Sequence, residues 1–173
     1  MRPPNGSCPI DRPSLALAVL LLMASGGCEN PRESVDRVQV IKHERILQLL
    51  HHGRIVKTYK VALGSEPVGP KQRQGDHRRP EGIYVLDSRN AHSLFYRSIH
   101  ISYPNQADKT RAAAAHVSPG GDIYLHGLPN GYGAVGAAHR LRDWTDGCIA
   151  VTDSEIDEIW NLVQNGTPIE IKP

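Results

Sequence analysis

Cys148 is the residue of this chain best equipped for chemistry, because two histidines precede it and a glycine stands directly before it. The histidines are His126 and His139, and the glycine is Gly147. An imidazole that accepts the thiol proton turns cysteine into a strong nucleophile, which is the minimum requirement for cysteine-based acyl transfer. Both histidines lie too far along the chain to share a helix face with Cys148, so the fold must bring the pair together.

Strand signals flank this region on both sides. Residues 122–126 are largely apolar and end at Gly127, and residues 148–151 are apolar and partly β-branched. Two adjacent strands are therefore expected to place an imidazole beside the thiol. The pattern leaves both His126 and His139 open as the base. Gly147 permits close backbone approach, and N–H groups around Cys148 are the expected donors to an oxyanion.

Around these residues the sequence resembles the catalytic domain of the L,D-transpeptidases, bacterial cell-wall enzymes with a nucleophilic cysteine. The resemblance implies a thiolate at Cys148, a base at His126, the Gly127 carbonyl as third member of the triad, and a peptidoglycan stem peptide as acyl donor, with no cofactor. The matching segments occur in the family's order beyond residue 35: Gly69-Pro70-Lys71, Gly75-Asp76, Pro80-Glu81-Gly82, Ser102-Tyr103-Pro104-Asn105, His126-Gly127, Asp143-Trp144-Thr145, Gly147-Cys148-Ile149 and Gly166-Thr167-Pro168.

Two positions depart from the common family pattern. Many relatives carry Ser-His-Gly-Cys followed by a hydrophobic residue and arginine, whereas here Asp146 replaces that histidine and Ala150 replaces the arginine. If the missing arginine holds a substrate carboxylate, Arg140 or Arg142 is the nearest replacement, because a guanidinium binds a carboxylate through two hydrogen bonds. The residues expected to bind substrate are Arg140, Arg142, Tyr103, Trp144 and Asp146.

Two charged features remain open to more than one interpretation. Asp146 either orients His139 or repels acidic substrates. The segment before Pro80 is either a solvated loop or a cationic rim that attracts acidic stem peptides; its basic residues are Lys71, Arg73, His77, Arg78 and Arg79.

The composition is typical of a protein with one globular domain. The chain has 173 residues, of which 39% are hydrophobic and 22% charged. Aromatic residues are sparse at 5% and the formal net charge is +2, so no basic face with interleaved aromatics predicts nucleic-acid binding. We expect a monomer.

Residues 1–27 have the pattern of an export signal. Arg2 and Arg12 supply positive charge, residues 15–23 are apolar, and small residues follow before Cys28. The apolar run is much shorter than the ~30 Å hydrocarbon core of a bilayer requires. Cleavage before Cys28 would give a lipid-anchored protein, and cleavage after Gly26 a soluble one. The catalytic domain is predicted over residues 35–173, in the periplasm or cell envelope.

Export makes the remaining cysteine unusual. Cys8 and Cys28 lie in or beside the leader, so Cys148 alone remains in the domain and has no disulfide partner. An unpaired cysteine in an oxidising compartment is liable to oxidation and mispairing. Burial as a small hydrophobic residue is the alternative explanation. The neighbouring glycine and histidine favour a chemical role instead.

The periodicities predict a mainly β domain, antiparallel and sandwich-like, with one packed helix after the cysteine. That helix is marked by capping-box spacing from Thr152 to Glu155, by an apolar stripe that includes Trp160, and by a stop at Gly166. Residues 105–115 form at most a short exposed helix, and residues 64–82 form a long loop. Strands are expected at 35–42, 46–50, 55–63, 83–87, 94–101, 123–126, 148–151 and 168–172.

Three classes of function fit these residues. The first is an acyltransferase that cleaves a tetrapeptide stem before its terminal D-alanine, forms a thioester on Cys148 and passes the acyl group to an amine; with water as acceptor, the same fold would act as an L,D-carboxypeptidase or an amidase on peptidoglycan or its lipoprotein link. The second is a zinc hydrolase using His126, His139 and either Cys148 or Asp146, although no metal-ligand spacing supports it. The third is a non-catalytic wall-binding module.

Overall fold

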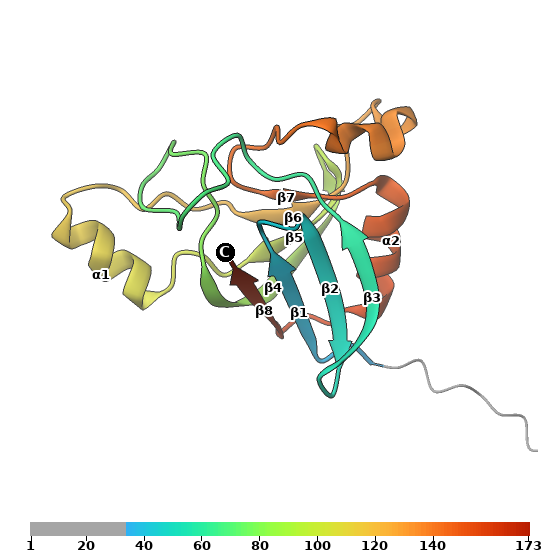
Figure 1. Ribbon diagram of the computed structural model, residues 1–173, viewed down its shortest axis with the longest axis horizontal. Coiled ribbons are helices and arrows are strands. Elements are labelled where there is room, and N and C mark those ends of the chain that lie inside the picture. Colours follow the sequence, from blue (N-terminus) through green and yellow to red (C-terminus); the bar gives the residue numbers. More distant parts are fainter. Residues whose placement is uncertain (1–33) are drawn as a thin grey trace, which may run out of the picture.

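The computed structural model describes residues 34–173, so the predicted export signal and Cys28 lie outside the described residues. Eight strands form one sheet in the order β3-β2-β1-β8-β4-β5-β6-β7, and Figure 1 shows β3, β2 and β1 side by side at one edge. The prediction of a mainly β domain is confirmed. The strands are β1 (Arg37–Ile41), β2 (Ile46–His51), β3 (Arg54–Lys60), β4 (Gly82–Ser93), β5 (Tyr96–Ile101), β6 (Tyr124–His126), β7 (Ile149–Ala150) and β8 (Thr167–Lys172).

Most neighbouring strands are antiparallel, as expected, but β1 with β8 and β6 with β7 run parallel. The sheet also folds back on itself, because Ala62, just beyond β3, exchanges two backbone hydrogen bonds of 2.9 Å with Ala150 in β7. The two edges of the sheet therefore meet around one apolar core. Fully buried core residues from both halves include Leu47, Leu49, Leu86, Ile99, Ile101 and Leu125.

The helix predicted after the cysteine is α2 (Asp153–Leu162), which lies against the sheet (Figure 1). The Thr152 side chain accepts the backbone N–H of Glu155, and the Glu155 carboxylate accepts that of Thr152, which completes the capping box. Trp160, from the predicted apolar stripe, is partly buried and packs against the core. The guanidinium of Arg89 lies 4.9 Å and that of Arg97 5.4 Å from its ring centroid.

Two further elements lie outside the sheet. Helix α1 (Gln106–Ala114) is short, as expected, and the Asn105–Asp108 capping box starts it. Its buried Asp108 accepts a 2.9 Å hydrogen bond from the Tyr84 hydroxyl, so a polar contact holds the helix in place of an apolar stripe. The 3₁₀ helix η1 (Gly133–Leu141) lies between β6 and β7 and was not predicted.

Strand β4 is longer than its apolar signal indicates. It continues past Asp87 to Ser93, and Asn90 pairs with Ser98 of β5. The side chains of this extension are polar, so hydrophobic periodicity could not detect it. Leu94, expected to begin the next strand, instead lies in the turn and is 80% exposed.

No helix in the described part of the chain is long and apolar enough to cross a membrane.

Candidate active site

The parallel pairing of β6 and β7 brings His126 and Cys148 to one face of the sheet. Leu125 lies opposite Ile149, and His126 lies opposite Ala150. Cys148 directly precedes β7 and stands two residues before Ala150. Residues two apart on a strand share a face, so the side chains of Cys148 and His126 lie on the same side of the sheet. Both side chains line a cavity of about 490 Å³. The expectation that two strands bring these residues together agrees with this geometry.

The imidazole of His126 is held in its neutral form. Its side chain is buried, and Nδ1 lies 2.7 Å from the carbonyl oxygen of Gly127. A carbonyl oxygen can only accept, so Nδ1 carries the hydrogen and Nε2 is left unprotonated. Burial lowers the pKa of His126 to about 4, although the Gly127 carbonyl opposes that shift. The imidazole is therefore uncharged near neutral pH and can accept a proton.

Close packing explains why a glycine follows this histidine. A Cβ at position 127 would lie 2.7 Å from Oδ1 of Asp153, the first residue of α2. The same oxygen accepts the backbone N–H of Leu128 at 2.8 Å. The start of α2 thus fixes the turn that presents the Gly127 carbonyl to His126.

Cys148 is protonated at rest. Burial raises the pKa of its thiol, and Asp146 and Asp122 raise it further, whereas the backbone N–H of Tyr124 and the charge of Arg79 lower it. The thiol donates to the carbonyl of Asp122, with Sγ 3.6 Å from the oxygen. A base must therefore remove the proton before the sulfur becomes a strong nucleophile.

The turn that carries Cys148, residues 145–148, is held by hydrogen bonds that Thr145 donates. The hydroxyl of Thr145 donates to the carbonyl of Cys148 at 2.7 Å, and the backbone N–H of Thr145 donates to Leu63 at 3.0 Å. Gly147 has a φ of 119°, and a Cβ there would lie 2.9 Å from the carbonyl oxygen of Arg78. Only glycine fits both the conformation and the approach of the neighbouring loop.

The low pKa of His126 predicts the acid limb of the pH profile. The neutral imidazole is the active form, so kcat/KM should stay nearly constant from pH 7 down to about pH 5 and fall as the pH drops through about 4. Initial rates measured across this range in buffers of constant ionic strength test this, with circular dichroism at each pH to confirm folding. An acid limb centred near the ordinary histidine pKa of about 6.5 would contradict a buried neutral base.

His139 lies on the other side of Trp144 from this cavity. The indole N–H of Trp144 lies 3.4 Å from Nδ1 of His139, which therefore accepts, and burial together with Arg140 lowers the pKa of His139. His139 lines a second cavity of about 570 Å³ and is not among the residues that line the first. Trp144 lines both cavities. The structure thus brings His126, not His139, to the cavity of Cys148.

Three of the expected substrate-binding residues do not line the Cys148 cavity. Arg140 forms an ion pair with Glu155, the capping residue of α2. Arg142 lines the second cavity. Tyr103 is 3% exposed and its hydroxyl donates to Pro119 at 2.9 Å. Asp146 does line the Cys148 cavity, but its carboxylate accepts a 3.0 Å hydrogen bond from His77 and does not orient His139.

Because Arg140 stabilises the start of α2, we expect Arg140→Gln to act on stability more than on substrate binding. Removing one partner of this partly buried ion pair should lower the free energy of unfolding by about 1 to 3 kcal/mol. Chemical denaturation measures the change, with Arg142→Gln as the control that should stay within about 0.5 kcal/mol of the parent protein. An Arg140→Gln protein with unchanged stability and a greatly raised KM would restore Arg140 as a substrate ligand.

Sequence reasoning missed most of the cavity wall. Beyond Cys148, His126 and Trp144, the lining comes largely from the β4–β5 hairpin and from the start of β6 with the loop before it: Ser88, Arg89, Asn90, Ser93, Leu94, Phe95, Ser98, Asp122 and Tyr124. Phe95 also packs on the His126 ring, with centroids 4.5 Å apart. The mostly polar run from Ser88 to Ser93 was the one available signal.

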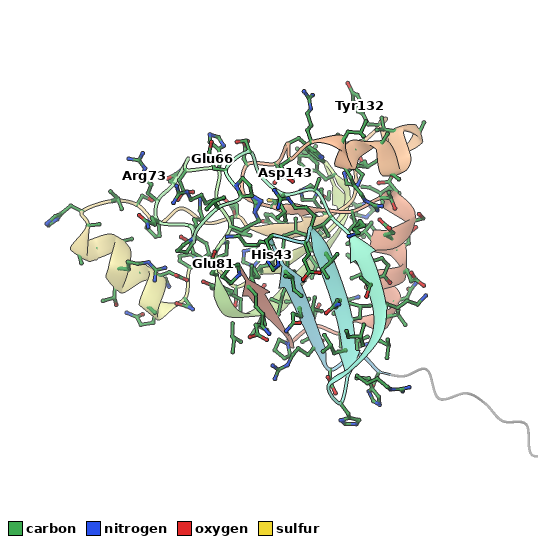
Figure 2. The ribbon with its side chains drawn as sticks, viewed as in Figure 1. His43, Glu66, Arg73, Glu81, Tyr132 and Asp143 are labelled. Carbon is green, nitrogen blue, oxygen red and sulfur yellow. The ribbon has the colours of Figure 1, made fainter. Side chains whose placement is uncertain are left out.

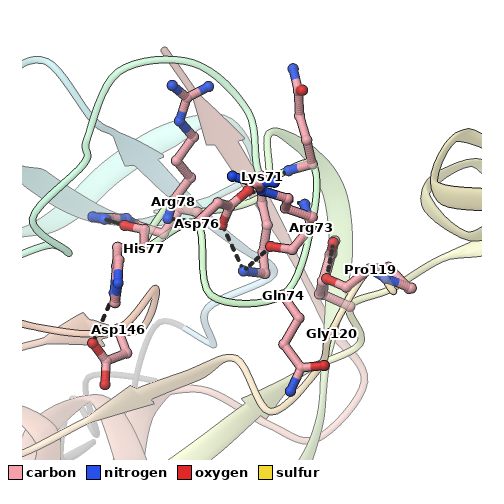
Figure 3. A network of polar contacts seen from close by, with 12 residues as sticks. Lys71, Arg73, Gln74, Asp76, His77, Arg78, Pro119, Gly120 and Asp146 are labelled. Carbon is pink, nitrogen blue, oxygen red and sulfur yellow. Dashed lines mark hydrogen bonds and ion pairs between the residues drawn. The ribbon is translucent and has the colours of Figure 1, made fainter. Parts of the chain in front are cut away.

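The basic loop is largely a structural element. Lys71 is 3% exposed and its ammonium lies 2.9 Å from Asp76, as Figure 3 shows. Although burial opposes it, the hydrogen bond from Lys71 and those from neighbouring backbone N–H groups lower the pKa of Asp76 to about 2. Arg79 is fully buried. Two of the basic residues expected in a cationic rim, Lys71 and Arg79, are therefore buried. Arg73 projects outward (Figure 2).

Within residues 34–173, one set of three potential metal ligands converges, and it consists of Asp36, His51 and His52 around the β2–β3 turn. His126, His139 and Cys148 do not form such a set. This geometry gives no support to the zinc hydrolase alternative.

Comparison with known proteins identifies the family of this chain. The family model of the L,D-transpeptidase catalytic domain (YkuD) matches residues 35–171. The chain therefore belongs to the L,D-transpeptidase catalytic domain family. It is 33% identical over 133 residues to YafK of Escherichia coli strain K12, whose name gives L,D-transpeptidase as a provisional activity; the match covers 73% of this chain and 46% of YafK.

Two solved structures are similar over most of the chain. The helical cell shape determining protein Pgp2 of Campylobacter jejuni has a TM-score of 0.62 and 26% identity, covering 80% of this chain and 48% of Pgp2. Bd1075 of Bdellovibrio bacteriovorus has a TM-score of 0.57 and 26% identity, covering 83% of this chain and 49% of Bd1075. The chain thus spans about half the length of the relatives it matches.

Proposed function

We propose that this protein is a cysteine-dependent acyltransferase that acts on peptidoglycan stem peptides, with Cys148 as nucleophile and His126 as base. The observation that carries the proposal is the neutral His126, fixed by Gly127 and lining the same cavity as a protonated, unpaired Cys148. Membership of the L,D-transpeptidase family supplies the substrate class. The enzyme would act in the periplasm or cell envelope, exported by residues 1–27.

The residues support a two-step reaction. Nε2 of His126 takes the Cys148 proton, and the thiolate attacks the carbonyl carbon of the residue before the terminal D-alanine. Backbone N–H groups at Cys148 stabilise the oxyanion. The C–N bond then breaks, protonated His126 gives its proton to the leaving amine, and a thioester remains. An amine attacks the thioester, His126 accepts its proton, and the thiolate leaves.

The charges around the thiol favour an amine as the second substrate. Asp122 and Asp146 both line the cavity and both act electrostatically on Cys148. Carboxylates at these positions attract an ammonium group and hold it near the thioester. The same charges would also bind the side-chain amine of a diamino residue in the donor stem. Arg140 is withdrawn into its pair with Glu155 and contributes no charge to this cavity.

Product analysis distinguishes the outcomes. The protein is incubated with disaccharide-tetrapeptide, with and without an added D-amino acid, and the products are read by mass spectrometry. Transpeptidation gives a crosslinked dimer lacking one D-alanine, or an exchanged terminal residue when the D-amino acid is present. Loss of D-alanine alone would assign a carboxypeptidase. Absence of any product would contradict the proposal.

A further inference from the structure

Arg79 is a buried cation with unsatisfied hydrogen-bonding groups. Its side chain has 0% relative exposure, and its Nη2 donates to the carbonyl of His77 at 3.2 Å. Among the described residues, neither Nε nor Nη1 has a hydrogen-bond partner. Burying a guanidinium with unpaired donors is costly, so its retention requires a compensating interaction.

The nearby carboxylates are already occupied by other cations. Asp143 accepts from Nε and Nη2 of Arg45 at 3.0 and 2.8 Å, and its other oxygen accepts the backbone N–H of Leu63 at 2.8 Å. Asp76 is engaged by Lys71. Asp143 and Asp76 each pair with another cation, so Arg79 forms no ion pair with them, although their charges partly offset its own. Burial lowers the pKa of Arg79 to about 10, so it stays charged at neutral pH.

Packing places this charge against the turn that carries the thiol. A Cβ at Gly64 would lie 2.5 Å from Nη2 of Arg79 and 2.6 Å from the carbonyl oxygen of Thr145. The guanidinium of Arg79 and the start of the turn therefore both pack closely against Gly64. The carbonyl of the preceding residue, Arg78, approaches Gly147 equally closely. The loop 71–79 and the turn 145–148 are also joined by the pair of His77 and Asp146 (Figure 3).

Before proton transfer, Arg79 is the cation among the described groups that act most strongly on the Cys148 thiol. The others are the carboxylates of Asp122 and Asp146 and the phenol of Tyr124, none of which carries positive charge. His126 is neutral at rest for the reason given above. A thiolate at Cys148 would supply a negative charge that offsets the positive charge of Arg79. Arg79 would in turn stabilise the thiolate.

We propose that Arg79 supplies the buried counter-charge of the Cys148 thiolate, acting through the sulfur as a positioning residue without touching the substrate. The inference rests on the proposed nucleophilic role of Cys148. It assigns to the loop before Pro80 an electrostatic function within the site. The thiolate forms before acylation and reappears when the thioester breaks, so the charge favours both steps.

The test measures alkylation of Cys148 by iodoacetamide, a neutral reagent, from pH 6 to 11 in the full chain, with peptide mass spectrometry to read Cys148 alone. We expect Arg79→Met to shift the midpoint of the pH–rate curve upward by about one unit and to slow alkylation at pH 7 by up to roughly tenfold. Arg79→Lys should stay within about threefold of the parent protein, because it keeps the charge. Arg73→Met, which removes an exposed arginine from the same loop, should match the parent protein.

A folded Arg79→Met protein with an unshifted midpoint overturns the proposal. If Arg79→Met does not fold, Arg79→Lys decides the question: folded protein that alkylates within about threefold of the parent supports the counter-charge, and a larger loss overturns it. The proposed function is tested separately by Cys148→Ser, and retained turnover in that variant would contradict it. That result would not affect the alkylation measurement on Cys148.

Discussion

Cys148→Ser should abolish release of D-alanine from disaccharide-tetrapeptide, with a loss of roughly three orders of magnitude or more. A hydroxyl is a far poorer nucleophile than a thiol near neutral pH, and one neutral imidazole cannot fully compensate. Release of D-alanine is followed by a coupled amino-acid assay or by mass spectrometry. The serine hydroxyl can still donate to the carbonyl of Asp122, as the thiol does.

The fold should survive this change, and thermal melting serves as the control. Oxygen for sulfur is close to isosteric, and neither the Thr145 hydrogen bond that closes the turn nor the glycine before it is altered. Turnover within about tenfold of the parent protein would remove Cys148 from the role of nucleophile.

His126→Ala should lower kcat/KM by roughly 10²- to 10⁴-fold, the usual contribution of a general base. Without the imidazole, the carboxylates of Asp122 and Asp146 are much weaker bases for the thiol proton, and burial keeps the thiol protonated. Steady-state kinetics on the tetrapeptide measure the loss. Added imidazole should restore part of the rate, because the substitution leaves a space beside Phe95 that a small base can enter.

His139→Ala is the matched comparison. It removes a ring that contacts Trp144 from the opposite side, so it should cost much less than loss of His126. A severe loss in His139→Ala together with near-normal turnover in His126→Ala would transfer the role of base to His139.

The proposed nucleophile and base could be chosen from the sequence because their signals are local. A glycine before Cys148, apolar strands on both sides, and a glycine after His126 fit one arrangement in which two strands meet. The capping box at Thr152 is local in the same way, and α2 begins where it predicts. The choice between His126 and His139 depended on the family resemblance, and the structure supplies the physical reason: His139 lies behind Trp144.

The parts that could not be predicted depend on contacts between segments far apart in the chain. Arg79 was one of five basic residues in a loop, and only tertiary packing distinguishes it from the exposed Arg73. The pairing of Arg140 with Glu155 likewise joins two segments with no common motif. The polar extension of β4 lacks apolar periodicity, because four of its residues, Ser88, Arg89, Asn90 and Ser93, line the cavity and none belongs to the apolar core.

The most direct measurement of the central claim is a single-turnover reaction quenched in acid. Excess protein is mixed with disaccharide-tetrapeptide without an amine acceptor, and peptides are mapped by mass spectrometry through the first turnover. The proposed function predicts that the peptide containing Cys148 carries the stem as a thioester lacking the terminal D-alanine, formed in step with released D-alanine. Release of D-alanine while Cys148 stays unmodified throughout that turnover would contradict it.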